Sequence, residues 1–150
     1  SYHFRFANIR HEDEEFIPRV FYYAQKVEHI PLVCYHYLQS QTSFMQNYKE
    51  KNLFDKVKAM DSLNQFNLHN VKEKDIQEAL RIHIALRLYE TIQTSYIIHS
   101  NCQKMLIKSM QNAGLVPMIH SRRKWLYLWL YRHTPNLFIQ IYKRKYCRIQ

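Results

Sequence analysis

Four consecutive acidic residues, Glu12–Glu15, are the side chains of this sequence best suited to acid–base chemistry. They open a predicted helix over residues 12–25, because Phe16, Val20 and Tyr23 recur at steps of three and four. The positive end of a helix dipole favours carboxylates in the first turn and keeps them ionised. An ionised carboxylate can serve as a general base. The cluster therefore predicts either a catalytic base or the solvated helix start that such clusters most often form.

An apolar run follows this helix at residues 30–37, with the sequence Ile-Pro-Leu-Val-Cys-Tyr-His-Tyr. We expect residues 27–38 to be extended, with Pro31 at a strand start or a sheet edge. Alternation would place Cys34 and His36 on one face of that strand, but the sequence offers no set of four ligands at the spacing of a zinc site. We therefore expect a packed thiol and no metal at this position.

The order of these features resembles the second half of a family 2 glycosyltransferase. The pattern is His-Glu-Asp-Glu-x-Phe-x-x-Arg over residues 11–19, then Ile-Pro-x-Val-x-Tyr-x-Tyr over residues 30–37, then Thr42-Ser43. Gly114-Leu115-x-Pro117 and the basic, aromatic carboxy-terminal segment also resemble the helical C-terminal region of this family.

The resemblance implies a parent enzyme of GT-A type fold that transfers a sugar from a nucleotide-sugar to an acceptor hydroxyl with inversion, in polysaccharide or glycolipid synthesis. It implies that Asp13 is the base that deprotonates the acceptor, and that Glu12 and His11 bind and orient the acceptor. One position departs from the pattern: many relatives show Tyr-Arg where this chain has Tyr37-Leu38. The roles of the acidic pair do not depend on that position.

The amino-terminal half of this family carries a Rossmann-like sheet and an Asp-x-Asp motif that holds a divalent metal, Mg or Mn, on the donor diphosphate. This chain has no Asp-x-Asp motif, one glycine and no strand–helix alternation of the required length. We therefore expect a C-terminal fragment that holds no cofactor and transfers no sugar by itself.

We expect a mainly α (α+β) fold, the helical C-terminal region of a GT-A enzyme with one short extended element near residues 27–38. Residues 1–45 would form the edge of the catalytic domain, and residues 46–150 a helical extension. A chain of 150 residues can bury a core, and a single glycine argues against an all-β fold. Three widely spaced cysteines without a Cys-x-x-Cys motif favour a reducing, cytoplasmic location.

Two long helices are predicted in the extension. The first runs from about Ser43 to Gln65 and is followed by a break at Asn67–Asn70. The second runs from about Lys72 to a left-handed cap at Gly114, with a break near Ser100-Asn101. Its apolar residues recur at steps of three and four and predict a core stripe. The members of this stripe are Ile82, Ala85, Tyr89, Ile92, Tyr96, Cys102, Leu106 and Met110.

Positive charge is concentrated at the carboxy-terminal end. Residues 1–90 hold 12 basic and 12 acidic residues, whereas residues 91–150 hold 10 basic residues and no acid, so the net charge of +10 lies there. This uneven distribution of charge predicts an anionic partner. The side chains that could bind it are Arg122, Arg123, Lys124, Trp125, Trp129, Lys143, Arg144 and Lys145.

No segment of this tail has the apolar length of a membrane-spanning helix, and tryptophans beside basic residues fit either helices in a membrane interface or helices packed on the parent domain. An interfacial tail would place the enzyme at the inner face of the membrane, near lipid-linked acceptors. Two other interpretations stay open: a basic helical nucleic-acid-binding module, and a helical interaction domain without chemistry.

Overall fold

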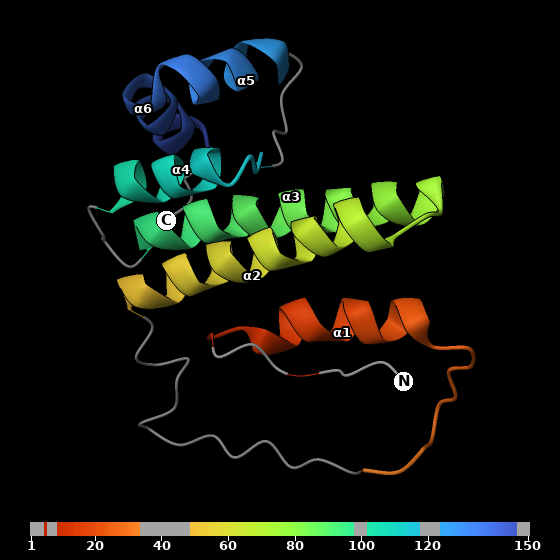
Figure 1. Cartoon of the computed structure of the whole chain (residues 1–150). Helices are drawn as coiled ribbons and strands as arrows, with labels where there is room; N and C mark the ends of the chain where they lie inside the picture. The colour runs from red at the N-terminus through yellow and green to blue at the C-terminus, as the bar shows by residue number, and fades with distance from the viewer. Residues whose placement is uncertain (1–4, 6–8, 34–48, 98–101, 118–123, 147–150) are drawn as a thin grey trace.

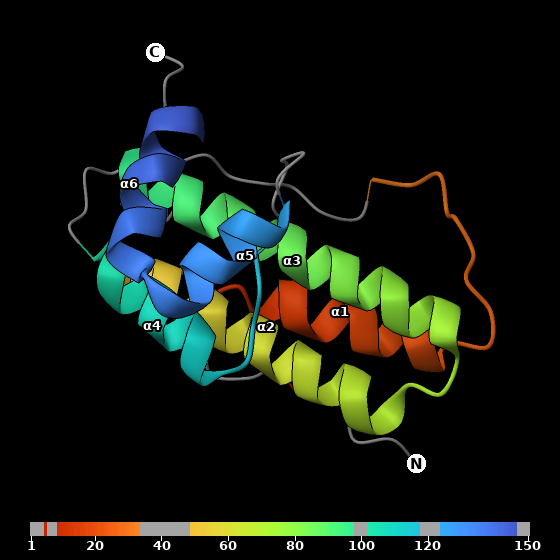
Figure 2. The ribbon, with the colours of Figure 1, turned by 90° about the horizontal axis from the view of Figure 1, so that it is seen from above.

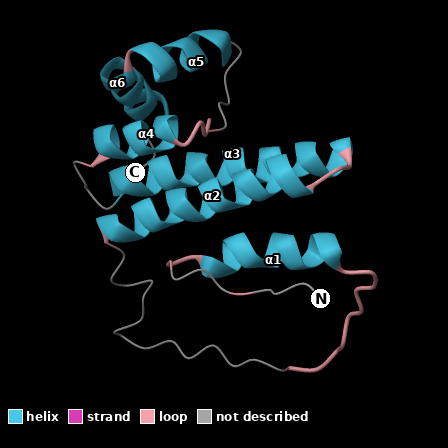
Figure 3. Ribbon diagram, viewed as in Figure 1, coloured by secondary structure: helices cyan, strands magenta, loops and turns pink. Residues whose placement is uncertain are grey.

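The computed structural model describes residues 5, 9–33, 49–97, 102–117 and 124–146, and these form six helices. The helices are α1 (Glu12–Tyr23), α2 (Glu50–Asn70), α3 (Lys74–Ile97), α4 (Gln103–Asn112), α5 (Lys124–His133) and α6 (Pro135–Tyr146). No strand occurs within those ranges (Figure 3). The prediction of a mainly helical chain is confirmed.

The long helices α2 and α3 form an antiparallel hairpin at the centre of the molecule (Figure 1). Helix α1 packs on α2 on one side of the hairpin, and α4 packs on α2 and α3 on the other side. Helices α5 and α6 pack against each other, and α6 also packs on α4 (Figure 2). The carboxy-terminal helices are therefore at the opposite side of the hairpin from α1.

One hydrophobic core runs between the hairpin and the carboxy-terminal helices. Helix α2 contributes residues at helical spacing, and α4 and the α5–α6 pair close the core from above. Apolar surface removed from water at these positions is the main favourable contribution to folding. The central buried side chains are Leu53, Val57, Met60, Leu63, Ile84, Leu88, Ile92, Leu106, Ile107, Met110, Tyr131 and Phe138.

The carboxy-terminal boundary of α2 differs from the prediction. Helix α2 continues to Asn70, so the predicted break at Asn67–Asn70 is wrong, and the turn lies at residues 71–73 instead. The side chain of Asn67 is buried there and donates a hydrogen bond of 3.0 Å to the carbonyl of Gln77 on α3. Asparagine is a poor helix former, but this tertiary bond satisfies the NH2 group of its side chain within the helix.

The predicted break in the second helix is confirmed, because α3 ends at Ile97 and α4 begins at Gln103. The predicted core stripe of α3 is wrong in part: Ile82 is 41% exposed, and the buried face carries Ile84, Leu88 and Ile92. That face includes the buried hydroxyls of Thr91 and Ser95, which donate to the backbone carbonyls of Arg87 (2.7 Å) and Ile92 (2.6 Å). Back-bonding of this kind makes polar residues compatible with a core face.

The expected extended element corresponds to an exposed loop where the structure describes it. Residues 27–33 form no strand, and the side chains of Val27, Ile30, Leu32 and Val33 are 61–80% exposed. A strand needs a neighbour to satisfy its backbone groups, and no strand is present elsewhere in the described ranges. The prediction of a strand is therefore wrong for these residues; residues 34–38 lie outside the described part.

Gly114 ends α4 in the left-handed conformation, with φ of 68°, as the sequence predicted. The amide of Leu115 donates to the carbonyl of Met110 (2.9 Å), and the amide of Gly114 donates to that of Gln111 (3.0 Å). These two bonds form a Schellman motif. Leu115 and Met110 are both buried, so the motif also turns the chain into the core.

We predict that Gly114→Ala lowers the free energy of unfolding by about 1 kcal/mol, because a Cβ is strained at positive φ. A Cβ at this position would meet no atom within 4 Å, so the cost should come from the backbone alone. Gly114→Asn is the matched control and should cost less, since asparagine tolerates this conformation. Urea denaturation measures both; equal losses in the two variants would contradict the explanation.

Candidate functional site

The four acids of α1 begin the helix directly after His11, whose backbone is left-handed with φ of 63°. No side chain caps the first turn, so its free amides and the helix dipole face the acidic side chains themselves. His11, Glu12 and Asp13, which are consecutive in sequence, lie at the amino-terminal end of α1. The structure separates the four acids into two pairs with different surroundings.

Glu15 is part of the packing between α1 and α2. Its carboxylate is only 1% exposed, accepts a hydrogen bond of 2.8 Å from Ser62 Oγ on α2, and pairs with Arg19 Nη2 at 2.6 Å. A buried carboxylate is tolerated when it is paired and hydrogen-bonded in this way. Glu15 is therefore a structural residue.

Glu14 is the centre of an ion-pair network that joins three segments. Its carboxylate lies 3.1 Å from Lys56 Nζ on α2, 3.6 Å from Arg87 Nε on α3 and 3.6 Å from His11 Nδ1. Arg87 is held in place by Glu90, to which it donates a hydrogen bond of 2.8 Å. Glu14 thus docks the start of α1 onto the helical hairpin.

Glu12 and Asp13 have different surroundings from Glu14 and Glu15. The Asp13 side chain is exposed, that of Glu12 is half-buried, and neither forms a hydrogen bond or ion pair with the residues that the structure describes. The carboxylate of Asp13 is therefore accessible to a ligand that approaches the start of α1. Sequence alone did not separate Glu14 and Glu15 from this pair, although the i,i+4 spacing of Glu15 and Arg19 was a signal.

Two histidines beside the network have lowered pKa values. Burial lowers the pKa of His11, and Lys56 lowers it further, against the opposing effect of the three nearby acids. Burial and then Arg87 lower the pKa of His83, whose Nε2 is buried without a hydrogen-bond partner in the described part of the chain. Both rings therefore favour the neutral form near neutral pH.

The carboxy-terminal site residues lie on α5 and α6. Trp125 is 72% exposed and Trp129 is 50% exposed, so these two aromatic rings are not part of the core. Lys124, Lys143 and Arg144 are exposed as well. Arg122, Arg123 and the side chain of Lys145 lie outside the described part.

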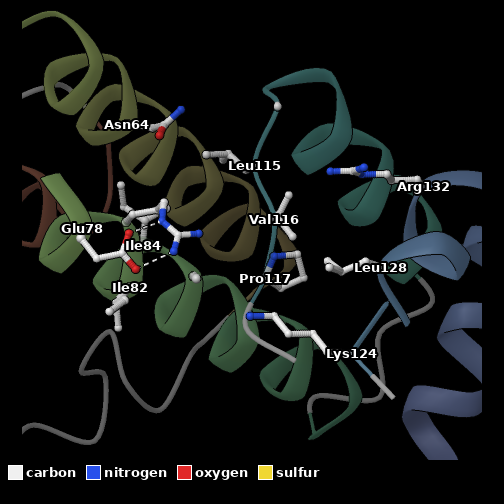
Figure 4. A pocket seen from close by; sticks show the side chains of 13 residues that line it. Asn64, Glu78, Ile82, Ile84, Leu115, Val116, Pro117, Lys124, Leu128 and Arg132 are labelled. Atoms are coloured by element: carbon white, nitrogen blue, oxygen red, sulfur yellow. Dashed lines mark hydrogen bonds and ion pairs between the residues drawn. The ribbon is translucent and has the colours of Figure 1, made fainter. Parts of the chain in front are cut away.

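A cavity that sequence analysis missed lies between the α2–α3 hairpin, the segment after α4, and α5 (Figure 4). Its volume is about 550 Å³, and three basic residues, Arg81, Lys124 and Arg132, line it together with apolar side chains. The sequence signal was weak, because Lys124, Leu128 and Arg132 recur every four residues but Arg81 comes from a distant helix. Only packing brings these residues to one cavity.

The described residues contain neither a cluster of metal ligands nor a membrane span. No group of three or more His, Cys, Asp or Glu side chains there is arranged to hold a metal ion. None of the described helices is both long enough and apolar enough to cross a bilayer.

Comparison of the chain with protein-family models, curated proteins and solved structures found no match. Inferences about function therefore depend on the residues and geometry described above.

We predict that His83 makes stability sensitive to acid. Its folded pKa is below the ordinary value of 6.5, so the unfolded chain binds the proton more readily as the pH falls through that value. The stabilising contribution is present above about pH 6.5 and is lost below it. Burial of the ring makes the largest contribution; the charges of Arg87 and Lys56 add to it, and those of Glu14 and Glu90 oppose it.

His83→Gln should therefore lose less stability than wild type between about pH 7.5 and pH 5.5, measured by urea denaturation at each pH. His29→Gln, at an exposed loop position, is the control and should follow the wild-type curve. An unchanged loss in His83→Gln would exclude this residue as the source.

Proposed function

We propose that this chain is the acceptor-binding, carboxy-terminal part of a family 2 glycosyltransferase, with Asp13 as the general base. The observation that carries the proposal is the accessible carboxylate of Asp13 at the start of α1, beside Glu14 and Glu15, which are used in ion pairs. Docking of α1 through Glu14 and Glu15 leaves the carboxylate of Asp13 accessible to an acceptor. The sequence pattern around residues 11–19 supplies the chemical class.

In the proposed reaction, the Asp13 carboxylate accepts the proton of the acceptor hydroxyl while the oxygen attacks the anomeric carbon and the nucleoside diphosphate leaves from the opposite face. The carboxylate must then lie within about 3 Å of the acceptor oxygen. Glu12 can accept a hydrogen bond from a second acceptor hydroxyl. Neutral His11, whose pKa is lowered by burial, can donate or accept one. The resemblance assigns the donor and its metal to an amino-terminal half of the enzyme.

The exposed apolar loop after α1 also supports the proposal. Val27, Ile30, Leu32 and Val33 are 61–80% exposed, which is unusual for four apolar residues within seven positions. Residues 27–33 follow α1 after a short connection, at the end of the helix opposite Asp13. Contact of this loop with a catalytic domain would bury its apolar surface and hold α1 against that domain.

We predict that Asp13→Asn in the full-length enzyme lowers kcat by about 10²–10⁴-fold, because the amide cannot accept the proton. Donor affinity should stay close to that of wild type. Asp75→Asn is a matched control: Asp75 is the second residue of α3, as Asp13 is of α1, and it is exposed. Its kcat should be unchanged.

Glycosyl transfer to the acceptor and titration of the donor measure these effects. Near-normal turnover in Asp13→Asn would mean that the acids only stabilise the helix start. An equal loss in both variants would indicate a general effect of charge at helix ends, and would also oppose the assignment.

We further propose that α5 contacts an anionic membrane surface, because Trp125 and Trp129 are exposed beside Lys124 and Arg132. Exposed tryptophans next to basic residues suit the headgroup region of a bilayer. The alternative, a nucleic-acid-binding module, would use the same residues for stacking and phosphate contacts. Salt weakens both kinds of binding, so the aromatic response must separate them.

We predict a blue shift of tryptophan fluorescence with anionic vesicles and only weak binding of oligonucleotides at about 150 mM salt. The chain has two tryptophans, so Trp129→Phe reports Trp125 alone and Trp125→Phe reports Trp129 alone. Trp125 is the more exposed of the two and should shift more. Submicromolar oligonucleotide binding with quenching, and no response to vesicles, would favour the nucleic-acid module instead.

A further inference from the structure

The cavity beside α5 combines apolar walls with positive charge. Ile82 from α3, Val116 and Pro117 from the segment after α4, and Leu128 from α5 form apolar parts of the lining. A cavity of about 550 Å³ is within the size range of small-molecule sites, which are mostly apolar with a few polar groups that orient the ligand. The cavity therefore has the dimensions and the lining of a ligand site.

The geometry of α5 places its cations at this cavity. Lys124, Leu128 and Arg132 lie four residues apart, so they share one side of the helix and all line the cavity. The buried side of α5 carries Tyr127, Leu130 and Tyr131. Packing of that side into the core therefore holds Lys124 and Arg132 at the cavity wall (Figure 4).

The charges at the cavity are not balanced. Arg81 is paired with Glu78, to which it donates hydrogen bonds of 2.6 and 2.7 Å. Lys124 and Arg132 form no ion pair within 4 Å of an acid in the described part of the chain, although the charge of Lys124 helps Arg81 to lower the pKa of Glu78. Glu78 is the one acidic residue among the described lining residues, and Arg81 already neutralises it. Two positive charges are left to face the cavity.

We propose that this cavity binds a phosphate group attached to an apolar moiety, with the phosphate on Lys124 and Arg132 and the apolar part against Ile82 and Leu128. A phosphate monoester carries a charge of about −1.5 to −2 at neutral pH, which matches the two free cations. The guanidinium of Arg132 can donate two parallel hydrogen bonds to phosphate oxygens, and Lys124 contributes a point charge. Such a phosphate can belong to a soluble compound or to a lipid headgroup.

The test measures binding of three probes to the whole chain by calorimetry. The probes are inorganic phosphate, phenyl phosphate and dioctanoyl phosphatidic acid below its micellar concentration. We expect both amphiphilic probes to bind at least about ten-fold more tightly than inorganic phosphate, because the apolar walls contribute to affinity. Equal affinities for all three, or no binding of either amphiphile below about 1 mM, would overturn the proposal.

Charge-removing variants locate the site. Lys124→Gln and Arg132→Gln should each weaken binding of the amphiphilic probes by about ten-fold or more, because each loses a hydrogen bond to a charged group. Lys143→Gln removes an equally exposed cation from α6, outside the cavity, and should leave the affinity within about two-fold. A similar loss in Lys143→Gln would indicate non-specific attraction and overturn the assignment. All three residues are exposed, and circular dichroism verifies that each variant is folded.

Two further measurements separate the sources of the phosphate and the proposed membrane contact. Binding to vesicles that contain phosphatidic acid, blocked by saturating phenyl phosphate, would identify a lipid headgroup in the cavity; binding of phenyl phosphate without vesicle binding would identify a soluble compound. Vesicle binding that depends on Trp125 and Trp129 and that phenyl phosphate does not block would support the membrane surface alone. That outcome would count against the cavity.

Discussion

The carboxylates of Glu14 and Glu15 set the position of α1 on the helical hairpin, and the candidate site depends on that position. Glu15 is 1% exposed and is held by Ser62 and Arg19. The pair with Arg19 lies within α1, so the contacts that fix the helix on α2 are those of Glu15 with Ser62 and of Glu14 with Lys56. Rotation of α1 would leave the buried Glu15 carboxylate without Ser62, and an unsatisfied buried group is costly. Consecutive helical residues are about 100° apart. Once Glu14 and Glu15 face the hairpin, Asp13 is left exposed at the helix start.

Buried contacts also fix the orientation of α5, at the other side of the molecule. Tyr131 is buried there and donates a hydrogen bond of 2.7 Å to the carbonyl of Leu115, while its own carbonyl accepts one from Gln111. Burial raises the pKa of Tyr131 well above its usual range, so the hydroxyl remains a donor. These bonds connect α5 to the end of α4. They decide which residues of α5 line the cavity and which are exposed.

The two proposed sites therefore depend on helix docking in a similar way. At α1, ion pairs and a buried carboxylate select which acid is accessible; at α5, aromatic burial selects which cations face a cavity. In both cases, residues close together in sequence have different surroundings. Glu14 and Asp13 differ in this respect, and so do Trp125 and Tyr127. Exposed and buried side chains thus lie within one helical turn of each other.

Local sequence signals predicted several features well, because those features depend on few residues. The helix after His11 was predicted from its acidic start and apolar spacing, and the left-handed Gly114 from its position before Pro117. The extended element at residues 27–33 was not found, because a strand depends on a neighbour that the sequence of the segment cannot specify. The prediction of a break at Asn67 was wrong because it, too, depended on a distant residue: the side-chain NH2 group of Asn67 donates a hydrogen bond to the carbonyl of Gln77 across the turn.

By itself, the sequence determined the helical character, the acidic start of α1 and the basic end of the chain. These properties follow from composition and from spacing within single helices. Only the tertiary structure decided which acids are buried, which face of α3 enters the core, and that Arg81, Lys124 and Arg132 meet at one cavity. The physical reason is that burial and pairing arise between helices, from contacts that join residues distant in the chain.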